Sequence, residues 1–193
     1  PDDCGAENGY FAGGHGDFTV TLDRERRYFY FHFDNYSGPD GAQGVGLARL
    51  PFAWRDQPVG KVEKFFEGSW NEPGLGGRVS PAIPVRTPWG QAGADAFWGP
   101  TIHWNTHLNL FVMLLNRSCC EPGWPVSGIH IAFNADLANP YGWTAPREIL
   151  AAEEAGWYPQ AVGVDQGESD RVGGQVVRLY MGSDSNHIIV FNR

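Results

Sequence analysis

Alternation of apolar and polar residues is the strongest pattern in the chain. From Asp17 to Leu22, Phe18, Val20 and Leu22 fall on one face and Asp17, Thr19 and Thr21 on the other, which predicts a β-strand. Residues 28–33 (YFYFHF) are aromatic at both parities, so we expect a central strand that is packed on both faces.

The strand pattern occurs three times along the chain. Each unit has a first strand, a hairpin, a long apolar second strand, a loop and a third strand, and the units span about residues 13–67, 95–150 and 156–193. Residues 67–96, rich in Gly, Pro and Trp, form an insertion that we interpret as a structured loop. Residues 146–155 are the one candidate helix, with a strand plus loop as the alternative.

Consecutive antiparallel units of this kind predict an all-β fold made of β-propeller blades. Since known propellers have about 4–8 blades, three units would make about three of five blades, an incomplete ring. We therefore expect residues 1–193 to be one propeller-like domain, a piece of a longer chain whose remaining blades are its partner. The alternative is a β-sandwich or jelly roll that is complete in this length.

Composition narrows the function classes. The net charge of -8 argues against nucleic acid and anionic membrane surfaces as partners, and no apolar run approaches the roughly 20 residues of a membrane span. Cys4, Cys119 and Cys120 allow either a disulfide from Cys4 to one of the adjacent pair, or three free thiols. Asn35 and Asn116 stand in glycosylation acceptor patterns. We expect a secreted or periplasmic protein.

The first strands of propeller blades line a central channel, so their leading ends should carry the binding site. These ends hold carboxylates among aromatic and amide side chains, a combination that suits sugars, because rings stack on aromatic faces and hydroxyls bond to polar groups. The candidates are His15, Asp17, Asp95, Trp98, Trp157, Tyr158 and Gln160.

Three further residues are candidates from their surroundings. Trp70 and Glu72 lie in the insertion, which would bring them to a ligand if it folded over the binding face; a surface loop packed on its own Trp is the alternative. His103 is four residues from His107, but the segment has the pattern of a hairpin, which argues against a zinc pair and favours a single channel-facing histidine. We expect no required cofactor, with a structural calcium ion as the one alternative.

Several segments resemble the five-bladed β-propeller glycoside hydrolases of the family 43 kind. They are residues 16–20 (GDFTV), 28–31 (YFYF), 44–49 (GVGLAR), 97–104 (FWGPTIHW) and 110–114 (LFVML). The resemblance implies hydrolysis by a base, a general acid and an Asp that tunes the acid. Asp17 matches the tuning Asp, and Trp98 stands at the acid's position, where Asp95 or Glu72 would have to substitute.

Three hypotheses follow from these patterns. The first is a glycoside hydrolase that acts on a polysaccharide or oligosaccharide, with Asp17, Asp95 and Glu72 as its catalytic candidates. The second is a carbohydrate-binding propeller without catalysis, which Trp98 at the acid position favours. The third is a compact β-sandwich module.

Overall fold

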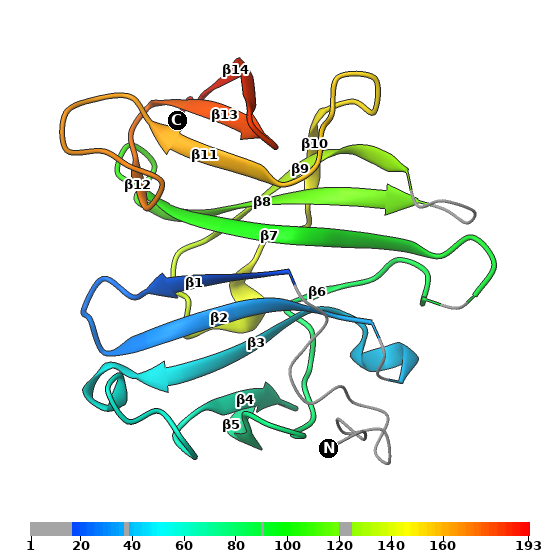
Figure 1. The fold of residues 1–193 in the computed structure, drawn as a ribbon, viewed down its shortest axis with the longest axis vertical. Helices are drawn as coiled ribbons and strands as arrows, with labels where there is room; N and C mark the ends of the chain where they lie inside the picture. Colours follow the sequence, from blue (N-terminus) through cyan, green and yellow to red (C-terminus); the bar gives the residue numbers. More distant parts are fainter. Residues whose placement is uncertain (1–16, 37–38, 90, 120–124) are drawn as a thin grey trace.

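The structure is a computed structural model that describes residues 17–36, 39–89, 91–119 and 125–193. Within these ranges the chain is all-β: it has strands in three sheets, three short 3-10 helices and no α-helix (Figure 1). The 3-10 helices are η2 (Asp40–Ala42), η3 (Phe52–Trp54) and η4 (Pro140–Gly142).

Each sheet is built around an antiparallel meander. The first sheet is β1 (Phe18–Leu22), β2 (Tyr28–Asn35), β3 (Gly44–Pro51), β4 (Glu63–Phe66) and β5 (Ser69–Pro73) in that order, with β6 (Ile83–Pro84) paired to β3. The second has the order β10 (Arg147–Leu150), β9 (Val126–Asn134), β8 (Leu110–Cys119), β7 (Asp95–Asn105) and β12 (Val172–Gly173), the last pairing parallel to β7. The third is β11 (Pro159–Gly163), β13 (Val176–Met181) and β14 (Asp184–Val190).

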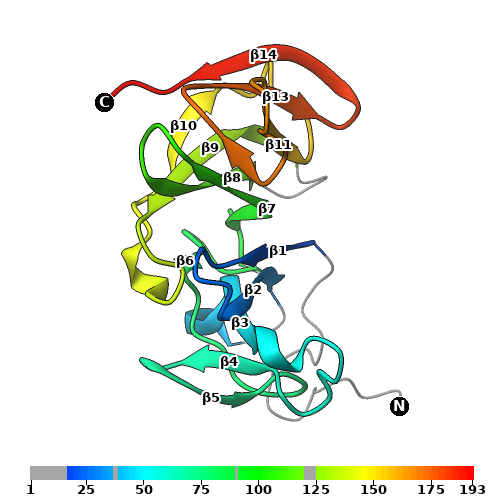
Figure 2. The ribbon, with the colours of Figure 1, turned by 90° about the vertical axis from the view of Figure 1, so that its left-hand side faces the viewer.

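The first strands of the three meanders lie side by side. β1 contacts β7, and β7 contacts β11, so the three sheets follow one another along the molecule (Figures 1 and 2). This is the arrangement of propeller blades, in which first strands gather at the centre and later strands extend outward. The prediction of all-β blades is confirmed, and the two-sheet sandwich is not what forms.

β8 is the strand that packs on both faces. Met113 and Leu115 join the core between the first and second sheets, whereas Val112 and Leu114 join the core between the second and third. All four side chains are fully buried. The continuous apolar run 110–115 follows from this position, since a strand covered on both faces has no polar side.

β2 was expected to be a central strand packed on both faces, and it is central but covered only in part on one face. Its Tyr30 and His32 face the second sheet and are fully buried, but Phe29 and Phe31 on its other face are only half-buried. Phe33 packs there in a small cluster with Ala42, Ala48 and Val79. The aromatic pattern of β2 therefore reflects one sheet-to-sheet core and one partly covered outer face.

Two other expectations are settled by pairing. Residues 146–155 do not form a helix; Arg147 and Glu148 pair with β9 as the edge strand β10, which confirms the alternative of a strand plus loop. The insertion 67–96 contributes β5 and β6 to the first sheet instead of closing over a ligand.

None of the helices in the described residues is long and apolar enough to span a membrane.

The antiparallel pairing of β3 with β6 requires a glycine at position 44. Gly44 has φ +136°, and a Cβ there would overlap the Ile83 carbonyl oxygen. We predict that Gly44→Ala lowers the free energy of unfolding by about 2 kcal/mol or more, since strain and overlap add. Gly41→Ala is the matched control: its Cβ would meet nothing within 4 Å, and a change of under about 0.5 kcal/mol is expected. Urea unfolding measures both, and equal stabilities would contradict the assignment.

Candidate functional site

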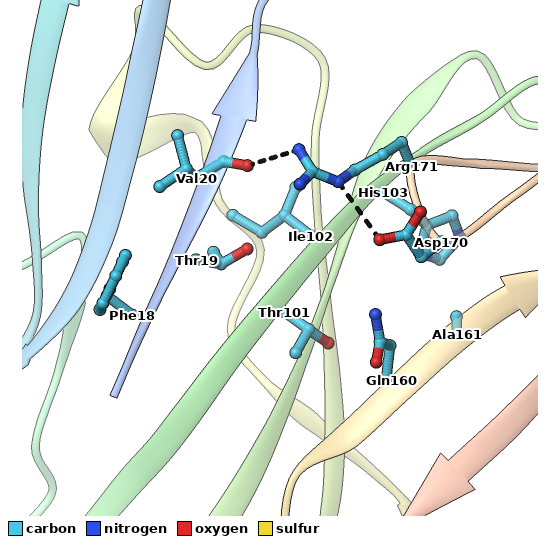
Figure 3. Close-up of a pocket in the computed structure, with 10 residues that line it drawn as sticks. All are labelled: Phe18, Thr19, Val20, Thr101, Ile102, His103, Gln160, Ala161, Asp170 and Arg171. Atoms are coloured by element: carbon cyan, nitrogen blue, oxygen red, sulfur yellow. Dashed lines mark hydrogen bonds and ion pairs between the residues drawn. The ribbon is translucent and has the colours of Figure 1, made fainter. Parts of the chain in front are cut away.

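A polar pocket of about 330 Å³ lies where the three first strands meet (Figure 3). Each sheet supplies part of its wall, and the segment before β12 supplies the rest. The lining residues are Phe18, Thr19, Val20, Thr101, Ile102, His103, Gln160, Ala161, Asp170 and Arg171. Hydroxyl, amide, carboxylate and guanidinium groups thus face one space, which is the mixture of donors and acceptors that polyhydroxylated ligands require.

Arg171 connects two walls of this pocket. Its guanidinium donates to the Val20 carbonyl at 2.9 Å and to Asp170 at 3.3 Å, and Figure 3 shows it reaching toward β1. Its own carbonyl accepts from the Trp104 amide. Neither Asp170 nor Arg171 is among the candidates from the sequence, so both are pocket residues that sequence reasoning missed.

Asp17 is the residue before Phe18, which lines the pocket, and it lies opposite Asp34 in the pairing of β1 with β2. The Asp34 amide donates to the Asp17 carbonyl at 3.1 Å, and the register of β1 and β2 places both side chains on the face toward the second sheet. Asp17 is half-buried, and desolvation raises the pKa of its carboxyl. Asp34 is fully buried, and burial raises the pKa of its carboxyl well above the ordinary value.

β7 supplies the groups around Asp34. The Gly99 amide donates to Asp34 Oδ2 at 3.3 Å, while Asp34 Oδ1 has no hydrogen-bond partner among the described residues. The adjacent Trp98 packs against Tyr36, whose hydroxyl donates to the Phe97 carbonyl. The pKa of a carboxyl so enclosed is raised, because ionisation would leave a buried charge with one weak donor.

Asn116 holds the aromatic end of the site. This buried side chain donates to the Gly156 carbonyl and accepts from the Tyr158 amide, both at 2.8 Å. The segment it fixes carries Trp157 and Tyr158, which are 40% and 56% exposed with ring centroids 6.3 Å apart. Tyr158 has φ +59°, and a Cβ on Gly99 would lie 3.5 Å from its ring. The Tyr158 ring is therefore held beside Gly99, and both rings before β11 are open to solvent.

Both asparagines of the glycosylation patterns are buried and bonded to backbone. Asn35 donates to the Ala42 carbonyl at 2.8 Å and is 1% exposed, and Asn116 is fully buried. A glycan cannot be accommodated at either side chain in this fold, so the patterns carry structural asparagines.

His103 lines the pocket from β7 but is nearly fully buried. Its Nε2 has no partner within the described ranges, and burial lowers its pKa to about 4. The ring is neutral at physiological pH and lies against Gly173. The described residues contain no group of three or more His, Cys, Asp or Glu that could hold a metal ion.

The two other carboxylate candidates are engaged by arginines. Both oxygens of Asp95 accept from Arg117, at 2.8 and 2.7 Å, and Asp95 is four residues before Gly99 on β7, roughly 13 Å along a strand. Glu72 accepts side-chain and backbone hydrogen bonds from Arg78, which lower the pKa of its carboxyl. Neither is brought next to Asp17.

Trp70 lies on the outer edge of the first sheet with Glu72. Its ring packs edge-on against Tyr30 and Phe65 and beneath the guanidinium of Arg49. β5 is four strands from β1, roughly 19 Å in a sheet. Of the sequence-predicted residues, only His103 and Gln160 line the pocket, and Asp17 directly precedes its residue Phe18. Trp98, Trp157 and Tyr158 lie near Gly99 or before β11 without lining the pocket, and Trp70, Glu72 and Asp95 lie elsewhere. His15, Cys4 and Cys120 lie outside the described residues.

Comparison with known proteins gives two similar solved structures. The catalytic domain of a GH62 α-L-arabinofuranosidase from Coprinopsis cinerea is 12% identical with a TM-score of 0.49, and an α-L-arabinofuranosidase from Podospora anserina in complex with cellotriose is 15% identical with a TM-score of 0.45. Each match covers 93% of this chain and 51% of that chain, so the chain spans about half their length. No family model and no curated protein matches.

The two hydrogen bonds that Asn116 makes to residues 156 and 158 can be tested by removing its side chain. We predict that Asn116→Ala lowers the free energy of unfolding by about 2 kcal/mol, since a buried amide and carbonyl lose their partner. Asn186→Ala, on an exposed position of β14, should change it by less than about 0.5 kcal/mol. Chemical denaturation measures both. An Asn116→Ala protein as stable as the wild type would contradict a stabilising role for these two hydrogen bonds.

Buried histidines predict loss of stability in mild acid. Burial lowers the pKa of His103 from 6.5 to about 4 and that of His32 to about 3. Between pH 6.5 and 5 these histidines bind protons in the unfolded chain that the folded chain refuses, so their contribution to stability falls as pH falls, by up to about 1.4 kcal/mol per pH unit for each histidine. The raised pKa values of Asp17 and Asp34 act in the opposite direction. His103→Leu should reduce the change of unfolding free energy per pH unit by up to about 1.4 kcal/mol, which urea unfolding at several pH values over this range would measure. An unchanged slope would contradict the burial.

Proposed function

We propose that the chain binds a saccharide in the polar pocket and that Asp17 takes part in acid–base hydrolysis of its glycosidic bond. The observation that carries this is the half-buried Asp17 carboxyl with its raised pKa, beside the pocket and opposite buried Asp34. A carboxyl whose pKa is raised holds a proton closer to neutral pH, as acid–base hydrolysis requires.

The surroundings of Asp17 fit a sugar ligand. Gln160 and Thr101 offer amide and hydroxyl groups at the pocket wall, and Thr101 is fixed by its 2.6 Å bond to the Pro159 carbonyl. Trp157 and Tyr158 supply exposed rings at the start of β11. We infer a polysaccharide or oligosaccharide as the substrate class. Polysaccharides are substrates that a protein encounters outside the cytoplasm, so this substrate class supports a secreted or periplasmic location.

Hydrolysis needs a second carboxyl at a set distance from the first, about 5–5.5 Å or about 6.5–9.5 Å according to stereochemistry. Asp95 is held by Arg117 and Glu72 by Arg78, and Asp34 is buried. Asp170, the carboxylate that lines the pocket, is paired with Arg171. The same observation favours a second candidate function, carbohydrate binding without turnover.

Replacement of Asp17 tests the catalytic proposal. Asp17→Asn keeps the shape and removes the proton exchange, so release of reducing sugar from arabinan or xylan should fall by about tenfold or more. Asp56→Asn, at an exposed carboxylate in a surface turn, is the matched control and should keep full activity. Thermal unfolding verifies that both variants fold. A fully active Asp17→Asn protein would refute the assignment.

Binding and turnover are separated by a titration. Arabino- and xylo-oligosaccharides added to isotope-labelled protein should shift the amide signals of Thr101 and Gln160, and Tyr158→Ala should weaken binding by about tenfold through lost stacking. Saturable binding with no product after long incubation would select the non-catalytic function. Absence of binding by all of these sugars would contradict both the hydrolytic and the non-catalytic function.

A further inference from the structure

A second, larger pocket lies on the outer face of the first sheet. Its volume is about 610 Å³, within the range of pockets that take small molecules. The floor consists of Phe18, Phe31, Phe33 and Ala48 from β1, β2 and β3. Phe18 is 64% exposed, so an apolar surface is open to solvent here, on the opposite face of the strands from Asp17 and Asp34.

Two turns wall this floor and make it concave. One is residues 58–60 and the other is residues 73–75, and they lie together because the Gly74 amide donates to the Val62 carbonyl at 2.9 Å. Val59 and Leu75 on these turns are 92% and 80% exposed. A face that packs on another sheet is flat and meets it at about 10 Å, whereas this one has apolar walls, which favours a ligand small enough to lie between them.

One cation lies at the base of the pocket. Lys64 is 3% exposed, its ammonium donates to the Gly77 carbonyl at 3.0 Å, and it lies 5.6 Å from the centre of the Phe33 ring. Glu72 lies opposite Lys64 in the pairing of β4 with β5 and attracts its ammonium, but both Glu72 oxygens also accept hydrogen bonds from Arg78. The ammonium has three N–H donors and shares this acidic neighbour with an arginine, so an anionic ligand would add a charge-assisted partner to its bond with Gly77.

We propose that this pocket binds an aromatic carboxylate, with the ring on the phenylalanine floor and the carboxylate on Lys64. Flat rings stack on Phe faces and on the Pro58 and Pro73 surfaces of the walls. The carboxylate forms a charge-assisted hydrogen bond with the ammonium. This pocket shares only Phe18 with the saccharide pocket, and the proposal does not depend on the role of Asp17.

The test compares 2-naphthoate with the uncharged 2-naphthalenemethanol by calorimetric titration. Naphthoate should bind saturably, and Lys64→Met should weaken it by about tenfold or more while it changes the alcohol by less than about threefold, because only the acid uses the charge. Lys61→Met is the matched control: Lys61 lies over the Trp54 ring and does not line the pocket, so neither affinity should change.

A second variant keeps the proposal testable if Lys64→Met is unstable. Leu75→Asp alters an exposed wall position and should weaken both probes, the anion more strongly. Absence of saturable naphthoate binding would overturn the proposal, as would equal losses of acid and alcohol in Lys64→Met. Self-association in sedimentation velocity that Leu75→Asp abolishes, without naphthoate binding, would assign the face to a second copy of the chain and also overturn it.

Discussion

The meeting of three sheets depends on an irregularity in β7. The register of β7 and β8 shifts between Trp98 and Thr101, where Gly99 takes φ +55°. The irregularity frees the Gly99 amide for Asp34 of the first sheet and aims Thr101 at the Pro159 carbonyl of the third. Bulges bend a strand and redirect its groups in this way. A regular β7 would direct the Gly99 amide and the Thr101 side chain differently, and these two bonds to the outer sheets would be lost.

The polar face of β1 is the buried one, and this inversion explains the position of the site. Thr21 is 6% exposed on the face toward the second sheet, whereas Phe18 on the apolar face is 64% exposed. Alternation identifies the two faces of a strand but not which of them another sheet covers. Here β7 covers the polar face, so Asp17 and Thr19 come close to the pocket and the phenylalanines form the floor of the second one.

Local signals predicted the all-β class and the succession of meanders, since alternation and turn residues act within a few positions. They also placed Asp17, Tyr158 and Gln160 at the leading ends of first strands, where the structure has them. Local signals could not predict the partners that depend on distant pairing. Asp95 meets Arg117 only because β8 returns beside β7, and residues 147–150 form a strand only because β9 offers an open edge.

Asn116 shows a further limit of sequence reasoning. Its acceptor pattern suggests a surface asparagine, yet the amide is fully buried and fixes the start of β11 at two points. Nothing within a few residues reports this, because its partners are about forty positions away. A signal was present in the apolar run before it: a residue that continues a strand buried on both faces has to be bonded inside the protein.

The interior between the first and second sheets is unusually polar for a sheet-to-sheet core. His32 has no partner for either ring nitrogen in the described part of the chain and meets Trp143 edge-on, and Asp34 has one oxygen unpartnered. Apolar residues of the same size would pack there at lower cost, since buried polar groups without partners destabilise a fold. Asp34 lies opposite Asp17 in the pairing of β1 with β2, so part of this cost falls beside the pocket. Desolvation there raises the pKa of both carboxyls.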